Sequence, residues 1–262
     1  MTTTYSIGFS LLILLHLLLL TFWLGADLGT FYSAQYVAKR ELTPPQRLVA
    51  LKIMAFVDMG PRICLVLFLP SGASLIAADP LGKSVHVLGQ SLRGWPIVAI
   101  WIGSLVWLGL VIADHHYGQN PAGALARKLD TGIRLLAVPT LLAFGLYTLI
   151  ANDPFGVQTN PKWLGAKVSL YGLAIACGIA IRYQLRPFPS GLKALMTDGS
   201  SPEVEDAVGG AINRSMPFVF AIWVLVVVIA FLGVAKPGAH LDKHPTSART
   251  LSQHGLPDLH RD

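Results

Sequence analysis

The chain has 262 residues, of which 53% are hydrophobic and only 13% are charged, and its formal net charge is +6. Soluble domains carry about 25% charged residues, so this composition indicates an integral membrane protein whose first partner is the lipid bilayer. The Lys and Arg residues collect in short segments between apolar runs, where they set membrane orientation, and the positive charge therefore does not indicate nucleic-acid binding.

Six apolar segments are each long enough to cross a bilayer as a helix, which takes about 20 residues. We predict spans at about 7–34, 51–78, 94–116, 130–152, 162–183 and 215–235. The expected fold class is therefore an all-α, polytopic membrane bundle of six transmembrane helices within residues 1–235. Residues 236–262 are polar and lack apolar periodicity, and we predict that they form a disordered tail.

Basic residues are most frequent after the first, third and fifth spans, for example at Lys39, Arg127 and Arg186. Because short loops rich in Lys and Arg stay on the inner side of a membrane, both termini are predicted to lie outside. In a bacterium this arrangement would place the chain in the inner membrane with periplasmic termini.

The first span contains a histidine, His16, near its middle, and the first acidic or basic residue of the chain is Asp27. Polar groups within a membrane are functional candidates, and neutral imidazole is a common ligand of metals and of haem iron. Two interpretations of His16 remain open: a hydrogen bond to a neighbouring carbonyl, or ligation of a buried metal or haem.

The second span carries Asp58 and Arg62, which are spaced to share one face of a helix and to pair. If the helix enters the membrane near Leu51, Arg62 lies roughly 16 Å in, at 1.5 Å per residue, which is also the expected depth of His16. Arg62 then either forms a self-contained ion pair or binds an anionic cofactor group such as a haem propionate.

The third and fourth spans resemble the first and second, which predicts a partial internal repeat of helix pairs. The matching segments are Asp58–Arg62 with Asp130–Arg134, and Trp23–Gly25 with Trp107–Gly109. The third span ends with His115 and His116, whose side chains point to different sides of a helix and so cannot both face one ligand. A second haem or metal bound by one of these two histidines remains an alternative.

The fifth span contains Lys167 within a turn or two of its outer end. Its side chain can extend to the membrane surface, or it can be buried and neutral, since desolvation disfavours the ammonium form, and then ligate iron.

Three stretches together resemble the HemJ-type protoporphyrinogen IX oxidases, which belong with the copper-resistance D-like membrane families. His16 is followed seven residues later by Trp23 and then by glycines and Phe31–Tyr32, like the family's first helix. Arg62 precedes Pro70 by eight residues, like its second helix, and Trp163–Leu164 followed by Lys167 is similar to the family's tryptophan, leucine and lysine segment. The likeness covers about half of the chain, and the third and fourth spans are an addition to the family's pattern.

This resemblance implies haem b as the cofactor. It implies His16 as the axial ligand of the iron and Lys167 as a second ligand or a catalytic residue, with Trp23 and Arg62 as further cofactor-binding residues. The leading hypothesis is a redox protein that oxidises a flat, apolar tetrapyrrole and passes electrons towards quinone. The alternatives are a non-enzymatic b-type cytochrome subunit of a larger membrane complex, and a copper-resistance D-like metal transport protein without haem. The partners expected besides the lipid bilayer are a quinone or tetrapyrrole, and either further copies of the chain in a homo-oligomer or a larger membrane complex.

Overall fold

A computed structural model describes residues 7–78, 85–87, 90–118, 120–152 and 161–238, and the predicted disordered tail lies almost wholly outside these residues. The long helices in chain order are α1 (Ile7–Ala38), α2 (Pro44–Val57), α3 (Met59–Ala78), α5 (Trp95–Tyr117), α6 (Pro121–Ile150), α7 (Lys162–Gln184) and α10 (Ala211–Ala235). Shorter elements are β1 (His86–Val87), β2 (Gln90–Ser91), α8 (Phe188–Thr197), α9 (Pro202–Glu205) and the π-helical turn η2 (Asp206–Gly210).

The described residues form six helical segments that are long and apolar enough to cross a membrane. The predicted helical fold class with six apolar helices is confirmed at this level, while the internal repeat of helix pairs stays a prediction. Two helices begin earlier than the apolar runs indicate, α2 at Pro44 and α6 at Pro121. Proline suits the first turn of a helix because its φ angle is preset and the first turn does not need its N–H, so both helices start at a proline before the apolar run.

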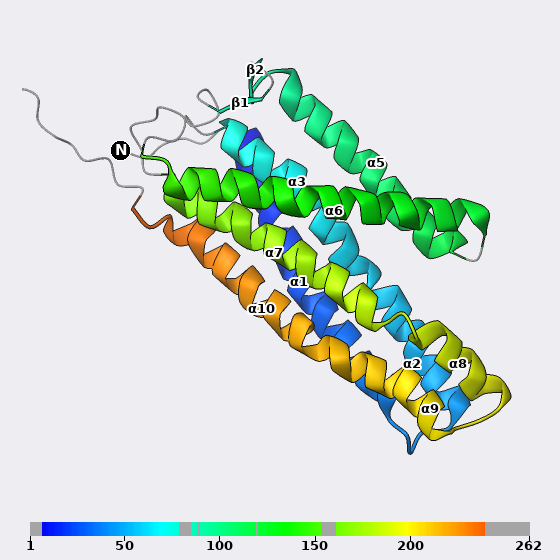
Figure 1. The fold of residues 1–262 in the computed structure, drawn as a ribbon. Helices are drawn as coiled ribbons and strands as arrows, with labels where there is room; N and C mark the ends of the chain where they lie inside the picture. Colours follow the sequence, from blue (N-terminus) through cyan, green and yellow to red (C-terminus); the bar gives the residue numbers. More distant parts are fainter. Residues whose placement is uncertain (1–6, 79–84, 88–89, 119, 153–160, 239–262) are drawn as a thin grey trace, which may run out of the picture.

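The membrane-sized helices pack in a ring in which α1 contacts α3, α3 contacts α5, α5 contacts α6, α6 contacts α7 and α7 contacts α10 (Figure 1). Contacts between α10 and α1 complete the ring. Helices α6 and α7 approach each other closely, and a Cβ atom added to Gly165 would lie 2.8 Å from the carbonyl oxygen of Gly145. Small residues allow membrane helices to approach closely, so these two glycines set the α6–α7 distance.

The main apolar core lies inside this ring and includes Trp23, Val66, Phe68, Trp107 and Ile175, all of which are buried. Large apolar side chains on the outer faces of the same helices are exposed, among them Phe22, Leu136 and Val224. Exposed apolar side chains on helices of this length are what a lipid-facing surface requires.

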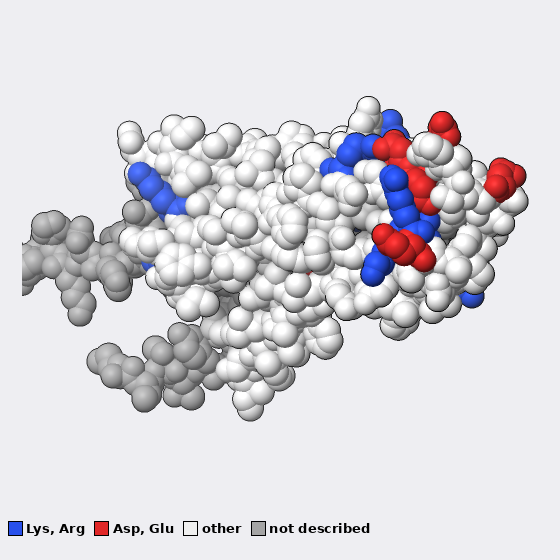
Figure 2. Space-filling model, turned by 90° about the horizontal axis from the view of Figure 1, so that it is seen from below, with Lys and Arg blue, Asp and Glu red and all other residues white. Residues whose placement is uncertain are grey.

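Charged side chains gather at one end of the molecule, which we call the charged end; it holds α2, α8 and α9 (Figure 2). On the face shown in Figure 2, the surface between the two ends is almost entirely uncharged. Helix α1 starts and α10 finishes at the opposite end, as six passes require (Figure 1).

A buried ion pair holds the charged end together. Arg47 of α2 donates to both carboxylate oxygens of Glu205 in α9, at 2.8 and 3.2 Å, and its Nε atom donates to the Val37 carbonyl at 2.7 Å. The Ser200 hydroxyl donates to the same carboxylate at 2.8 Å. Bidentate Arg–carboxylate pairs are geometrically specific, so this one fixes α2 and α9 against the last turn of α1.

Candidate cofactor site

His16 belongs to α1, close to the end of this helix that lies opposite the charged end (Figure 1), and its side chain contacts α3. Its Nδ1 atom is 2.8 Å from the Ser71 hydroxyl oxygen. Its ring meets the edge of Phe68 with centroids 4.6 Å apart. A Cβ atom added to Gly72 would lie 3.5 Å from the imidazole Cε1 atom. The imidazole is therefore fixed by three residues of one stretch of α3.

The hydrogen bonds of Ser71 determine which nitrogen of His16 carries the proton. The Ser71 hydroxyl donates to the Leu67 carbonyl at 2.7 Å. A hydroxyl has one proton to donate, so toward His16 it accepts, and Nδ1 is the protonated nitrogen. The lone pair of Nε2 then remains for a ligand, which is the arrangement that orients histidines bound to metals.

Lys167 of α7 is far from His16 in the sequence but lies near this imidazole in the structure. Its ammonium lies within electrostatic range of His16, and a Cβ atom added to Gly233 of α10 would meet its Nζ atom at 2.7 Å. Among the described residues no carboxylate forms an ion pair with Lys167. The structure therefore brings His16 and Lys167 into one region, and the position of Lys167 beside the end of α10 suits both the ligand interpretation and the surface-directed one.

Trp23 lies in the core rather than beside the imidazole. Its ring is 5.4 Å from Phe68 by centroids, and Phe68 stands between it and His16. The tryptophan therefore supports the site through Phe68.

Arg62 does not join His16, and the expectation that both lie at one depth is wrong. A Cβ atom on Gly60 would contact Ala26, whereas His16 contacts Ser71. Arg62 is thus about 14 Å along α3 from Ser71, at 1.5 Å per residue. An entry point assumed for each helix does not fix this depth, because α1 is 32 residues long, far longer than the hydrocarbon core requires. The predicted ion pair between Arg62 and Asp58 is present.

Asp27 belongs to the region around Arg62. Its carboxylate lies beside the indole groups of Trp23 and Trp223 and within electrostatic range of Asp58. In the described part of the chain no Lys or Arg pairs with Asp27. In the sequence, Asp27 stands out only as the first acidic or basic residue of the chain.

A second buried charge cluster surrounds Asp130, which is fully buried. Its carboxylate accepts from Arg134 Nε at 3.0 Å and from Trp107 Nε1 at 2.7 Å, and Arg182 lies at 2.7 Å. Asp130 and Arg134 have the spacing from which the matching pair of Asp58 and Arg62 was predicted. Trp107 and Arg182 come from other helices, so no local pattern could identify them as partners.

His115 and His116 end α5 as exposed residues, with ring centroids 5.3 Å apart. Within the described ranges no group of three or more His, Cys, Asp and Glu side chains gathers as a metal site.

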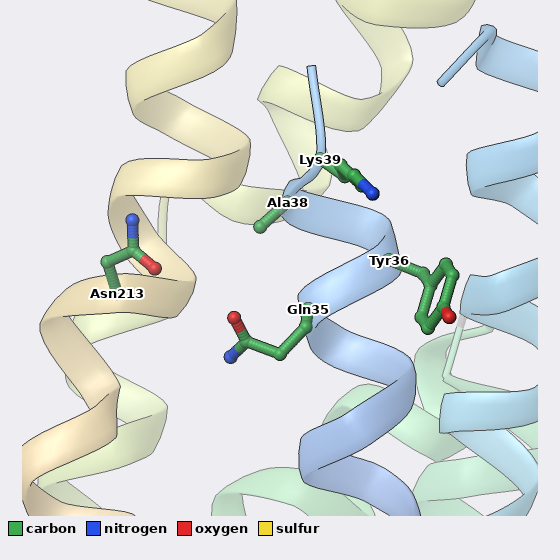
Figure 3. A pocket seen from close by; sticks show the side chains of 5 residues that line it. All are labelled: Gln35, Tyr36, Ala38, Lys39 and Asn213. Atoms are coloured by element: carbon green, nitrogen blue, oxygen red, sulfur yellow. The ribbon is translucent and has the colours of Figure 1, made fainter. Parts of the chain in front are cut away.

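A hollow of about 450 Å³ lies between α1 and α10 at the charged end. Gln35 and Asn213 face each other across it (Figure 3). Gln35 is about 28 Å along α1 from His16, at 1.5 Å per residue, so this polar hollow is separate from the His16 region.

Comparison of the chain with models of protein families, with curated proteins and with solved structures finds no match. The assignment of a function therefore depends on the residues themselves. The donor set of His16 and Lys167 suits haem iron, because one imidazole nitrogen is held for ligation and the absence of side chains at Gly72 and Gly233 lets the imidazole and the ammonium lie close against α3 and α10.

Proposed function

We propose that this chain is a haem b-binding redox protein of a membrane, similar in its site to the HemJ-type protoporphyrinogen IX oxidases. The observation that carries the proposal is that His16, with Nε2 available, and Lys167, which is 151 residues later in the chain, lie within electrostatic range of each other. Bound haem would supply a one-electron relay between a donor and an acceptor.

Each residue of the site then has a distinct task. His16 would ligate the iron through Nε2, and Ser71 would hold the imidazole in the required tautomer. Lys167 would be the second ligand, or the cation that pairs with a haem propionate. Phe68 and, behind it, Trp23 would exclude water from the imidazole and so keep the local dielectric low.

Arg62 is a weaker candidate for a propionate partner than the resemblance implies. It is held by Asp58 and lies about 14 Å from the level of Ser71. Lys167 offers a cation close to His16 instead, and we assign the anion-binding task to it.

We further propose that the charged end is the inner, cytoplasmic end. The observation that favours this orientation is the concentration of Lys and Arg side chains there (Figure 2). Both termini would then be periplasmic in a bacterial inner membrane, and the His16 site would lie in the outer half of the bilayer.

Absorption spectroscopy and complementation test the proposal. Protein purified from haem-replete cells should show a Soret band and, after reduction, an α-band. If wild-type protein also complements a strain that lacks protoporphyrinogen oxidase, it is an enzyme, and Lys167→Ala should abolish this complementation. Haem without complementation would assign the chain to the b-type cytochrome subunits, and the lack of haem would overturn both haem hypotheses in favour of metal transport.

A further inference from the structure

The hollow between α1 and α10 at the charged end has a polar wall. Gln35 and Asn213 contribute amide groups that face each other, Tyr36 contributes a phenol and Lys39 an ammonium (Figure 3). Lys39 is the only charged side chain among the described residues that line it. Its volume of about 450 Å³ lies within the range of roughly 300–1,000 Å³ that is typical of small-molecule sites. The hollow therefore has room for a polar group of several atoms, and its amides and ammonium offer hydrogen-bond donors to acceptor oxygens.

The positive charge of Lys39 is not neutralised by a neighbour. In the described part of the chain no carboxylate forms an ion pair with Lys39. The next residue, Arg40, is also basic and its side chain is 70% exposed, while the Glu205 carboxylate 3.9 Å from it is already bound by Arg47. The hollow therefore favours a negatively charged ligand.

Two features that would oppose an anion are compensated. The carboxylate of Asp206 lies 3.0 Å from Arg214, the residue after Asn213. The negative end of the α1 macrodipole also lies here, but the Val37 carbonyl in its last turn accepts a hydrogen bond from Arg47 at 2.7 Å. The charge of Lys39 therefore remains in excess.

An exposed apolar strip leads away from the hollow along α10. Phe220, Val224 and Val227 follow Asn213 by 7, 11 and 14 positions, a spacing that places all four on one face of the helix. The three apolar side chains are 48%, 64% and 57% exposed. Phe31 of α1 packs against Phe220 with ring centroids 5.6 Å apart, so the strip follows the seam between the two helices. A polar hollow at one end of an apolar strip matches the two parts of an amphiphile.

Two tyrosines place the hollow at the boundary of the membrane. Tyr32 and Tyr36 are both exposed, and their hydroxyl oxygens lie 3.0 Å apart. Tyrosine is enriched where a bilayer meets water. The Lys39 ammonium lies within electrostatic range of the Tyr32 hydroxyl, and lysine side chains at this level direct their charge to the membrane surface. A ligand in the hollow therefore has its polar part among lipid headgroups.

We propose that this hollow binds the headgroup of an anionic phosphoglycerolipid of the bilayer. The phosphate pairs with Lys39 and accepts hydrogen bonds from the amides of Gln35 and Asn213. The acyl chains lie along the apolar strip of α10. The lipid thereby joins α1 to α10, the most loosely packed neighbours in the ring. The inference goes beyond the haem proposal and does not depend on it, because the hollow is separate from the His16 region.

Quenching of tryptophan fluorescence by lipids with brominated acyl chains tests the proposal on the purified, delipidated chain in detergent. Trp223 reports on the strip, because its ring centroid lies 5.4 Å from that of Phe220, and its share of the signal is the part that Trp223→Phe removes. Phosphatidylglycerol should bind at least about tenfold more tightly than phosphatidylcholine, whose choline group cancels the phosphate charge.

Lys39→Gln should weaken phosphatidylglycerol about fivefold, the share of one basic residue at an anionic lipid surface. Its affinity for phosphatidylcholine should be unchanged, which also verifies that the variant is folded. Lys193→Gln is the matched control, because Lys193 is an exposed lysine of α8 at the same end of the molecule, and it should bind both lipids like the wild type. Glycerol 3-phosphate at the same concentration should not displace the lipid, since it has no acyl chains to bury.

Equal affinity of the wild type for the two lipids would overturn the proposal. Equal affinity of Lys39→Gln and Lys193→Gln for phosphatidylglycerol would also overturn it, because the hollow would then not hold the phosphate. Displacement of the lipid by an equal concentration of glycerol 3-phosphate would show that the hollow binds a soluble phosphate compound, and the assignment to a membrane lipid would be wrong.

Discussion

At the scale of single residues, the tautomer of His16 depends on one hydroxyl. Ser71 uses its proton on the Leu67 carbonyl and must accept from Nδ1. An imidazole without that partner can rotate or carry its proton on Nε2, where it would block ligation.

We expect Ser71→Ala to reduce haem affinity by about 10- to 100-fold, the usual effect of removing a group that orients a metal ligand. Haem titration of protein purified without haem measures this change. Ser74→Ala is the matched control, because Ser74 lies one turn later in α3 and bonds Trp101 instead of His16. If Ser71→Ala binds haem as tightly as Ser74→Ala, Ser71 does not set the tautomer.

At the scale of elements, two contacts between helices can be tested directly. The first is the buried pair of Arg47 and Glu205, whose side chains are 2% and 4% exposed. Removing one partner of such a pair leaves a buried charge without compensation.

Arg47→Leu should therefore lower the free energy of unfolding by about 3–5 kcal/mol. Arg40→Leu is the control, since Arg40 lies 3.9 Å from the same carboxylate but its side chain is 70% exposed, and exposed pairs contribute about 1 kcal/mol or less. Unfolding in a detergent series reports both values. Similar losses for the two variants would show that the pair does not hold α2 to α9.

The second contact is the close approach of α6 and α7. Gly165→Ala places a methyl group 2.8 Å from the Gly145 carbonyl oxygen and 2.9 Å from Thr148 Cβ, so the helices must move apart. The expected cost is about 1–3 kcal/mol, as for other overpacked sites.

Gly178→Ala, in the same helix, meets nothing within 4 Å and should be neutral or slightly stabilising, because alanine favours helix more than glycine does. Thermal unfolding compares the two variants. A Gly165→Ala protein at least as stable as Gly178→Ala would contradict the packing argument.

At the scale of the whole molecule, the distribution of charge predicts the orientation in the membrane. We expect a cysteine at Lys193, in α8 of the charged end, to be protected from a membrane-impermeant maleimide in intact cells. A cysteine at Lys162, at the start of α7, should react. Both are placed in a background without Cys64 and Cys177, and the reversed labelling pattern would show the opposite orientation.

Local patterns in the sequence predict the parts of this molecule that depend on neighbours in the chain. Apolar runs identify the six helical segments of membrane-spanning length, and spacing identifies the pairs Asp58–Arg62 and Asp130–Arg134. They do not predict the register between helices, because small residues and shape set it. For that reason Arg62 lies away from His16, and the partners of Arg47 and of Asp130 from distant helices were missed.

Haem content per chain is the most direct test of the central claim, that His16 ligates haem in the bundle. Wild-type protein and His115→Ala, which changes an exposed histidine outside the site, should carry haem at equal stoichiometry with a reduced α-band. His16→Ala should keep its fold by circular dichroism and lose haem or shift its Soret band. Unchanged haem content and an unchanged spectrum in His16→Ala, or no haem in the wild type, would contradict the account.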